Sequence, residues 1–163
     1  MTVMTEHLST YFQDHRAGAA FGSDLARRLY EENKGTQYED FLHRLADEID
    51  EDVATLEGLM ERFDVGKDRM KEVGAVIGEK LGRLKPNNAL TEYSPLSRVL
   101  ELEGMRGGVQ GKLGLWDSLS AVAPFDERLD ADKLASLVRR AEAQLAELRE
   151  QHRLAAQEAF API

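Results

Sequence analysis

Hydrophobic residues spaced three and four positions apart, over several long stretches, are the feature that most limits how this chain can fold. Such spacing places the hydrophobic side chains along one side of an α-helix, as in helical bundles. All four prolines, at positions 86, 95, 124 and 162, lie where this periodicity stops. The segments between them can therefore be long helices. No segment alternates as a β-strand does, so the sequence predicts an all-α protein.

The periodicity predicts four long helices, each with a seam of inward-facing positions. The first runs from about Leu8 to the "EENKGT" segment, where Gly35 is the expected C-cap. The third begins at Pro95 after the N-cap Ser94, and the fourth begins near Ala131. The predicted seams are Leu8, Tyr11, His15, Gly18, Gly22, Leu25 and Leu29; then Leu42, Leu45, Ile49, Asp52, Leu56, Leu59 and Phe63; then Leu96, Val99 or Leu100, Glu103, Gly107, Gln110, Leu113 or Gly114, and Asp117; then Leu134, Val138, Ala141, Leu145, Leu148, His152, Ala155 and Ala159.

A shorter amphipathic segment, residues 70–84, separates the second and third long helices. At about 1.5 Å per residue, a helix of this length can carry the chain back along the bundle. We therefore expect a single domain, residues 1–163, in which two antiparallel helical hairpins are joined by a long crossover. This is the connectivity of a ferritin-like four-helix bundle with an additional short crossover helix. Trp116 is expected to lie partly buried at the end of the bundle away from the first turn, near Phe12, Met60 and Phe63.

Composition excludes several classes of function. The chain has 163 residues, is 42% hydrophobic and contains no cysteine, so disulfides, cysteine-ligated metals and thiol nucleophiles are excluded. Its net charge of -9, with the basic residues scattered among acidic ones, disfavours nucleic acid as a partner. No apolar run approaches the length of a membrane span, and the first residues lack a signal-peptide pattern. We expect a cytoplasmic protein that does not bind membranes, and the outer helix faces are where a homodimer would form.

The stretch "ELEGMRGGVQGKLGLW", residues 101–116, places five glycines inside a predicted helix. Each interior glycine costs about 1 kcal/mol relative to alanine, so a compensating reason is expected. The favoured explanation is a close crossing of the first and third helices, since Gly18 and Gly22 are at nearly the same level as the glycines at 107, 108 and 111. A second explanation is a pocket for a flat ligand within the bundle. A phosphate-binding loop does not fit, because Arg106 and Leu113 replace residues that its motif requires.

Carboxylates and histidines interrupt the apolar seams. Glu48, Glu103 and His152 are expected at one level of the bundle, and His15, Asp52 and Gln110 about two turns lower. One interpretation is a carboxylate-type metal site, since imidazole and carboxylate suit iron, manganese or zinc. The other is that each cluster is a hydrogen-bonded pair that satisfies a buried charge and fixes helix register. The second interpretation is favoured.

Five segments carry a resemblance to a known group of proteins: "YFQDHRAGAAFGSDLARRL", "LADEIDEDVATLEGLMERF", "GRLK", "YSPLSRVLELEG" and "EGMRGGVQGKLGLW". They resemble small, uncharacterised bacterial proteins of the ferritin-like superfamily, over nearly the whole chain. The resemblance implies a four-helix bundle with ancestral metal chemistry. Ferritins and related di-iron enzymes carry a Glu-x-x-His pair, whereas here Arg149 stands three residues before His152. Glu48, Glu103 and His152 would then be remnants of a metal site.

Two functions follow from these observations. The first is a ferritin-like bundle without catalytic activity, acting as a structural protein or binding a partner or ligand. The alternative is a metal-binding oxidoreductase or metal-storage-related protein. It would hold iron or manganese at Glu48, Glu103, His152, Asp52 and His15.

Overall fold

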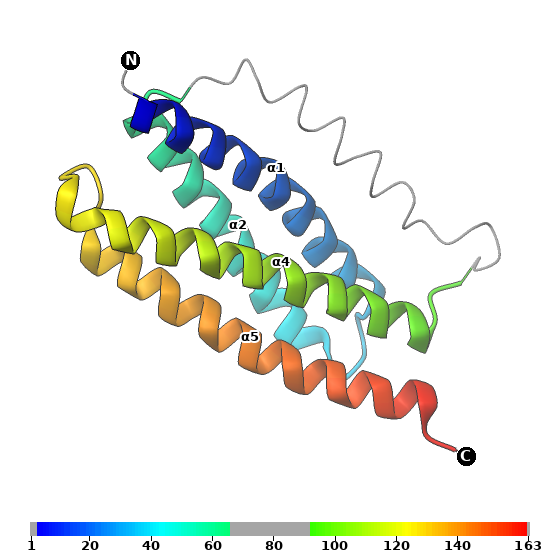
Figure 1. Ribbon diagram of the computed structural model, residues 1–163. Coiled ribbons are helices and arrows are strands. Elements are labelled where there is room, and N and C mark those ends of the chain that lie inside the picture. Colours follow the sequence, from blue (N-terminus) through cyan, green and yellow to red (C-terminus); the bar gives the residue numbers. More distant parts are fainter. Residues whose placement is uncertain (1–2, 66–91, 163) are drawn as a thin grey trace.

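The computed structural model describes residues 3–65 and 92–162, with side chains from Glu6 onward. Four long α-helices make up most of these two ranges (Figure 1): α1, Val3–Glu32; α2, Glu39–Arg62; α4, Pro95–Val122; and α5, Ala131–Phe160. A short 3-10 turn, η2, Ala123–Phe125, follows α4. No strand occurs in the described residues, so the predicted all-α class is confirmed. The predicted crossover helix at 70–84 lies outside the described residues.

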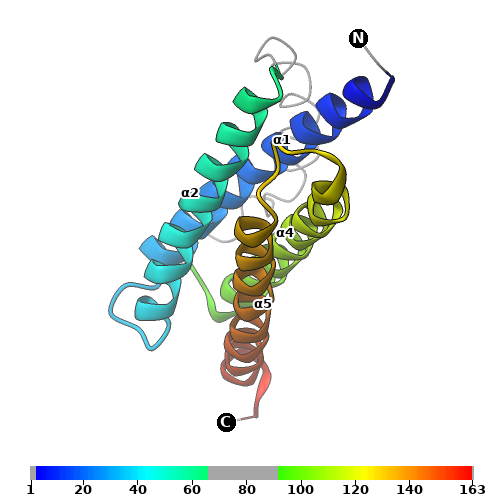
Figure 2. The same cartoon turned by 90° about the vertical axis from the view of Figure 1, so that its left-hand side faces the viewer.

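The four helices form two antiparallel hairpins, α1 with α2 and α4 with α5 (Figure 1). Helix α4 begins beside the α1–α2 turn, where Arg98 Nε donates to Asn33 Oδ1 at 2.5 Å. Helix α2 ends beside the α4–α5 connection, where the Arg128 guanidinium lies 3.9 Å from the centre of the Phe63 ring. Helices α2 and α4 therefore run in the same direction. Helix α1 packs against α4, so the two hairpins lie side by side (Figure 2).

Local sequence signals set the helix ends much as predicted. The Ser94 side chain accepts a hydrogen bond from the Ser97 backbone N–H at 3.1 Å, and Pro95 occupies the first helical position of α4. Asp130 caps α5 in the same way, accepting from the backbone N–H of Lys133 at 2.9 Å. After α1, Gly35 adopts a positive φ of 76°, which costs a glycine little. The main difference is that α1 begins at Val3 rather than near Leu8.

The predicted inward face is confirmed for α2, whereas most of the predicted positions of α4 do not face the core. All seven predicted seam positions of α2, from Leu42 to Phe63, are buried. In α4 the buried side chains are Val99, Leu102, Met105, Val109, Leu115, Trp116 and Leu119, and of these only Val99 is a predicted seam position. The predicted α4 positions Glu103, Gly107, Gln110 and Asp117 are exposed. The inward face of α4 is the apolar one, and the glycines flank it.

Trp116 is more completely buried than the sequence predicted. Its side chain is 1% exposed, and its indole Nε1 has no hydrogen-bond partner among the described residues. Phe12 and Phe63 pack together at the same end of the bundle as the α4–α5 connection, with ring centres 5.4 Å apart. The aromatic cluster expected at this end therefore includes a Phe12–Phe63 contact.

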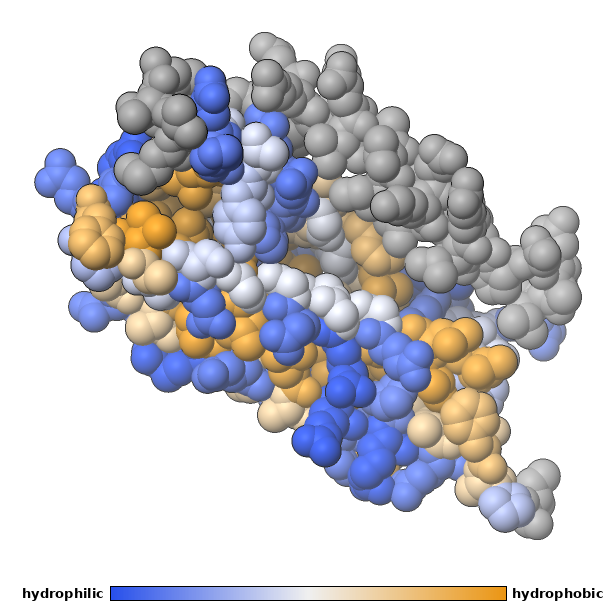
Figure 3. All heavy atoms as spheres, viewed as in Figure 1, coloured by the Kyte–Doolittle hydropathy of each residue, from blue (hydrophilic) through white to orange (hydrophobic). Residues whose placement is uncertain are grey.

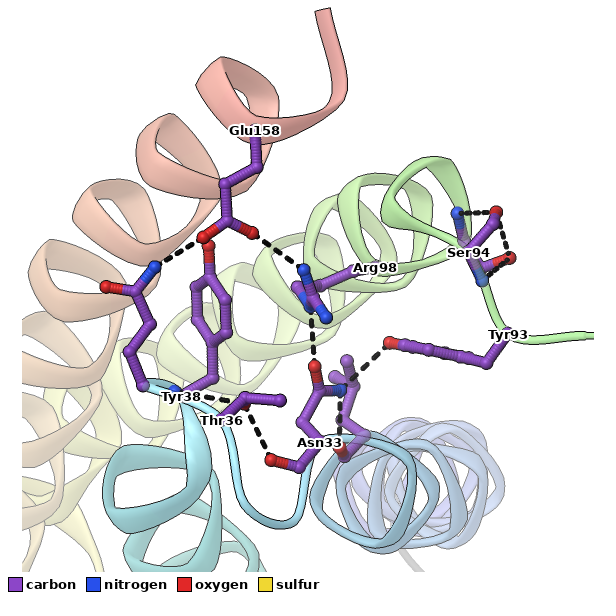
Figure 4. Close-up of polar contacts among 10 residues, drawn as sticks. Asn33, Thr36, Tyr38, Tyr93, Ser94, Arg98 and Glu158 are labelled. Carbon is purple, nitrogen blue, oxygen red and sulfur yellow. Dashed lines mark hydrogen bonds and ion pairs between the residues drawn. The ribbon is translucent and has the colours of Figure 1, made fainter.

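A polar network around Arg98 ties the other end of the bundle together (Figure 4). The buried Asn33 side chain donates to the Leu29 carbonyl at 2.7 Å and to the Tyr93 hydroxyl at 3.0 Å, while it accepts from Arg98. Arg98 also bonds Glu158 of α5 at 2.8 Å. These bonds link the end of α1, the start of α4 and the end of α5, and so hold the two hairpins in register.

On the face seen in Figure 3, apolar side chains gather at both ends of the α4–α5 hairpin, with polar and further apolar side chains between them. Phe125 lies exposed in η2 at one end, and Leu96 and Phe160 at the other. Within the described residues, no helix has the length and apolar character needed to span a bilayer.

Candidate ligand pocket

A pocket of about 390 Å³ opens between α1, α2 and α4. Its walls are mainly apolar and include Ile49 and Leu56 of α2 and Met105 and Leu115 of α4. The glycine-rich middle of α4 appears in Figure 3 as a pale strip, because glycine is nearly neutral on the hydropathy scale. The remaining lining residues are Tyr11, Asp14, His15, Gly18, Ala19, Gly22, Asp52, Val53, Gly107, Gly108, Gly111, Lys112 and Trp116.

Five of the lining residues are the glycines that the sequence singled out, and the predicted close crossing is wrong. A Cβ atom placed on Gly18, Gly107 or Gly111 would have no described atom within 4 Å apart from its immediate surroundings in the helix. At Gly22 and Gly108 it would approach only the end of the Met105 side chain, at 3.9 and 3.7 Å. The glycines of the two helices therefore do not face each other in a backbone-to-backbone contact. The glycines therefore border open space, and the flat ligand of the second explanation stays a prediction.

A buried carboxylate with two cationic partners borders the pocket. Asp52 is 3% exposed and accepts a hydrogen bond from Lys112 Nζ at 2.5 Å. Its second oxygen accepts from Arg140, which also bonds Glu51 at 2.7 Å. Lys112 in turn donates to Gln144 Oε1 at 2.5 Å. These contacts join α2, α4 and α5 through side chains.

Burial lowers the pKa of both basic groups that line the pocket. For Lys112 desolvation is the largest cause, opposed by the charge and hydrogen bond of Asp52. For His15 desolvation also lowers the pKa, and the Asp14 carboxylate opposes it. The His15 ring packs edge-on against Tyr11, with ring centres 4.5 Å apart. His15 therefore lines the pocket as a largely neutral imidazole at neutral pH.

The five predicted metal-site residues do not come together. Glu103 and His152 meet at 3.1 Å, but on the surface between α4 and α5, where 53% of the Glu103 side chain is exposed. Glu48 accepts a hydrogen bond from Gln144 Nε2 at 2.7 Å instead of joining them.

The second predicted cluster, formed by His15, Asp52 and Gln110, does not come together either. Asp52 is paired with cationic side chains, His15 packs edge-on against Tyr11, and Gln110 is exposed. In residues 3–65 and 92–162 no three His, Asp or Glu side chains gather closely enough to hold a metal ion.

The sequence interpretation missed Lys112, Arg140 and Gln144. Two of them could have been found from the correct helical face. Lys112 continues the buried α4 positions with spacings of three and four, between Val109 and Trp116, and Gln144 does so between Ala141 and Leu148 in α5. A carboxylate on the apolar seam of α2 was itself a signal, since it requires a cationic partner from another helix.

Comparison with protein-family models, with curated proteins and with solved structures finds no match to this chain.

Proposed function

We propose that this protein is a non-catalytic helical bundle that binds a small, mainly apolar ligand between α1, α2 and α4. The observation that carries the proposal is that glycines from two helices line a pocket that no described side chain fills. Each of them weakens its helix by about 1 kcal/mol, and among the described residues none gains a backbone contact that would offset this cost. Space for a ligand accounts for them.

The size and lining of the pocket support this proposal. A volume of about 390 Å³ lies within the range of known small-molecule sites, which run from roughly 300 to 1,000 Å³. Such sites are mostly apolar with a few polar groups that orient the ligand. Here the polar residues of the lining include Asp52, Lys112 and His15, which would supply that orientation.

We also propose that the bundle is ferritin-like, with residues 70–84 as the crossover helix. The directions of the helices support this, because α2 and α4 are parallel within two antiparallel hairpins, as in bundles with one long crossover connection. Metal binding at Glu48, Glu103 and His152 has less support, since only Glu103 and His152 meet. Metal analysis of protein purified without chelator, after supplementation with iron and manganese, tests that alternative.

Filling the pocket with a side chain tests ligand binding. Gly107→Leu adds a side chain that meets no described neighbour at its Cβ position, so the fold should tolerate it while the pocket loses volume. Gly58→Leu is the matched control, because Gly58 is also a helical glycine with open space but does not line the pocket. The probe is 2-isopropylnaphthalene, an uncharged apolar molecule, and the readout is the emission of Trp116, the only tryptophan.

The wild-type protein and Gly58→Leu should bind the probe with similar affinity, and Gly107→Leu should bind it at least about tenfold more weakly, because it removes ligand volume from the site. Equal affinity for all three proteins, or no binding to the wild-type protein, would contradict the proposed function.

A further inference from the structure

Two hydrogen-bond donors lie one helical turn apart in the α4 wall of the pocket. Lys112 and Trp116 are four residues apart, so their side chains share one face of the helix, and both line the pocket. An ammonium group has three N–H donors and no acceptor, and an indole has a single N–H donor. This wall therefore offers donors only.

Both side chains retain a donor that no described residue uses. Lys112 gives two of its N–H groups to Asp52 and Gln144, each at 2.5 Å, and the described residues provide no acceptor for the third. The Trp116 Nε1 atom is buried without a partner in the same part of the chain. A buried donor without an acceptor is unfavourable, so an acceptor atom brought by a ligand would be bound more tightly than an apolar group.

The charges around the pocket disfavour an ionic ligand. The Lys112 ammonium is already balanced by Asp52, and Arg140 by Asp52 and Glu51. A carboxylate ligand would approach Asp52, and also Asp14 in the pocket lining. A cationic ligand would approach the ammonium of Lys112 in a site of reduced dielectric constant, where like charges repel strongly. An uncharged acceptor avoids both penalties.

We propose that the ligand is an uncharged, mainly apolar molecule with a carbonyl oxygen that accepts the third N–H of Lys112. This inference rests on the proposed function, since it names the chemical class of ligand for the same pocket. The apolar part of the ligand lies against the glycine-lined wall, and the carbonyl oxygen is directed towards Lys112 Nζ.

Three naphthalene probes of nearly the same size and shape test the proposal: 2-acetylnaphthalene, 2-isopropylnaphthalene and 2-naphthoate. The first carries a ketone, the second replaces it with an apolar group, and the third replaces it with a carboxylate. Wild-type protein should bind the ketone at least about tenfold more tightly than either of the others, which corresponds to one charge-assisted hydrogen bond. In Lys112→Met the advantage of the ketone over the isopropyl compound should disappear, while the isopropyl compound itself still binds.

A second variant controls for misfolding, because Lys112→Met alone leaves the buried Asp52 carboxylate without one of its partners. Asp52→Asn combined with Lys112→Met removes both charges together, and it should show the same loss of ketone preference. A wild-type protein that binds the ketone no better than the isopropyl compound, or variants that keep the preference, would overturn the inference while leaving pocket binding intact. Failure of all three probes to bind the wild-type protein would overturn the proposed function as well.

Discussion

Replacing Asp52 with asparagine should destabilise the bundle strongly. Asp52 is 3% exposed and pairs with both Lys112 and Arg140. Removing one partner of a buried ion pair costs about 3–5 kcal/mol, because the remaining charge is left without compensation. Arg140 is partly exposed and keeps its bond to Glu51, so Lys112 is the charge that is stranded. We therefore expect a cost near the lower limit, about 3 kcal/mol at neutral pH.

Urea unfolding measures this cost, and a double variant identifies its origin. At a slope of about 2 kcal/mol per molar urea, the unfolding midpoint of Asp52→Asn should fall by about 1.5 M. Adding Lys112→Met to Asp52→Asn removes the stranded ammonium, so the double variant should be more stable than Asp52→Asn alone. A double variant that is less stable than Asp52→Asn would refute the assigned role of Lys112.

The pH dependence gives an independent check. Burial already lowers the pKa of Lys112, and loss of the Asp52 carboxylate removes the main interaction that raises it. The stranded ammonium therefore loses its proton in the folded variant before it does so in the unfolded chain, and the variant gains stability as the pH rises towards 10.5. The difference in unfolding free energy between wild type and Asp52→Asn should shrink between pH 7 and pH 10. A difference that stays constant would show that Lys112 is not the cause.

Two further predictions concern the ends and the surface of the bundle. His152→Leu should cost less than about 1 kcal/mol in a urea titration, because its Glu103 partner is 53% exposed and surface ion pairs contribute little; a cost of several kcal/mol would mean that the pair is buried. Burial raises the pKa of Tyr38 and of Tyr93 to about 12, so both phenols ionise in the unfolded chain at lower pH than in the folded protein. The free energy of unfolding should therefore fall as the pH rises above about 10, and this fall should be smaller in Tyr38→Phe; an equal fall would contradict the role of Tyr38.

Helix positions could be predicted from this sequence because their signals are local. Ser94 with Pro95 marks the start of α4, and the regular apolar spacing of α2 has a single consistent inward face. That face includes Asp52, so a buried carboxylate was also predictable. Its partners were not, since they depend on which residues of α4 and α5 face α2.

The inward face of α4 was harder to predict because glycines interrupt its pattern. Leu96 and Leu100 are exposed, and they drew the predicted seam to the wrong side of the helix. The predicted seam therefore placed Gly107 in the core. In the structure, Met105 and Val109 on either side of it are the buried residues. A glycine pattern permits either close helix contact or an empty space. The distance between α1 and α4 decides between them, and that distance depends on side chains of the whole bundle.

The glycines of α1 and α4 border open space, and the stability of alanine variants is the sharpest test of this arrangement. Gly18→Ala, Gly107→Ala and Gly111→Ala each add a Cβ atom where no described neighbour lies within 4 Å. Each variant should therefore be more stable to urea by about 0.5–1 kcal/mol, because alanine favours the helix over the unfolded chain. Destabilisation by about 1–3 kcal/mol would instead indicate overpacking at a close helix contact, and would contradict the pocket.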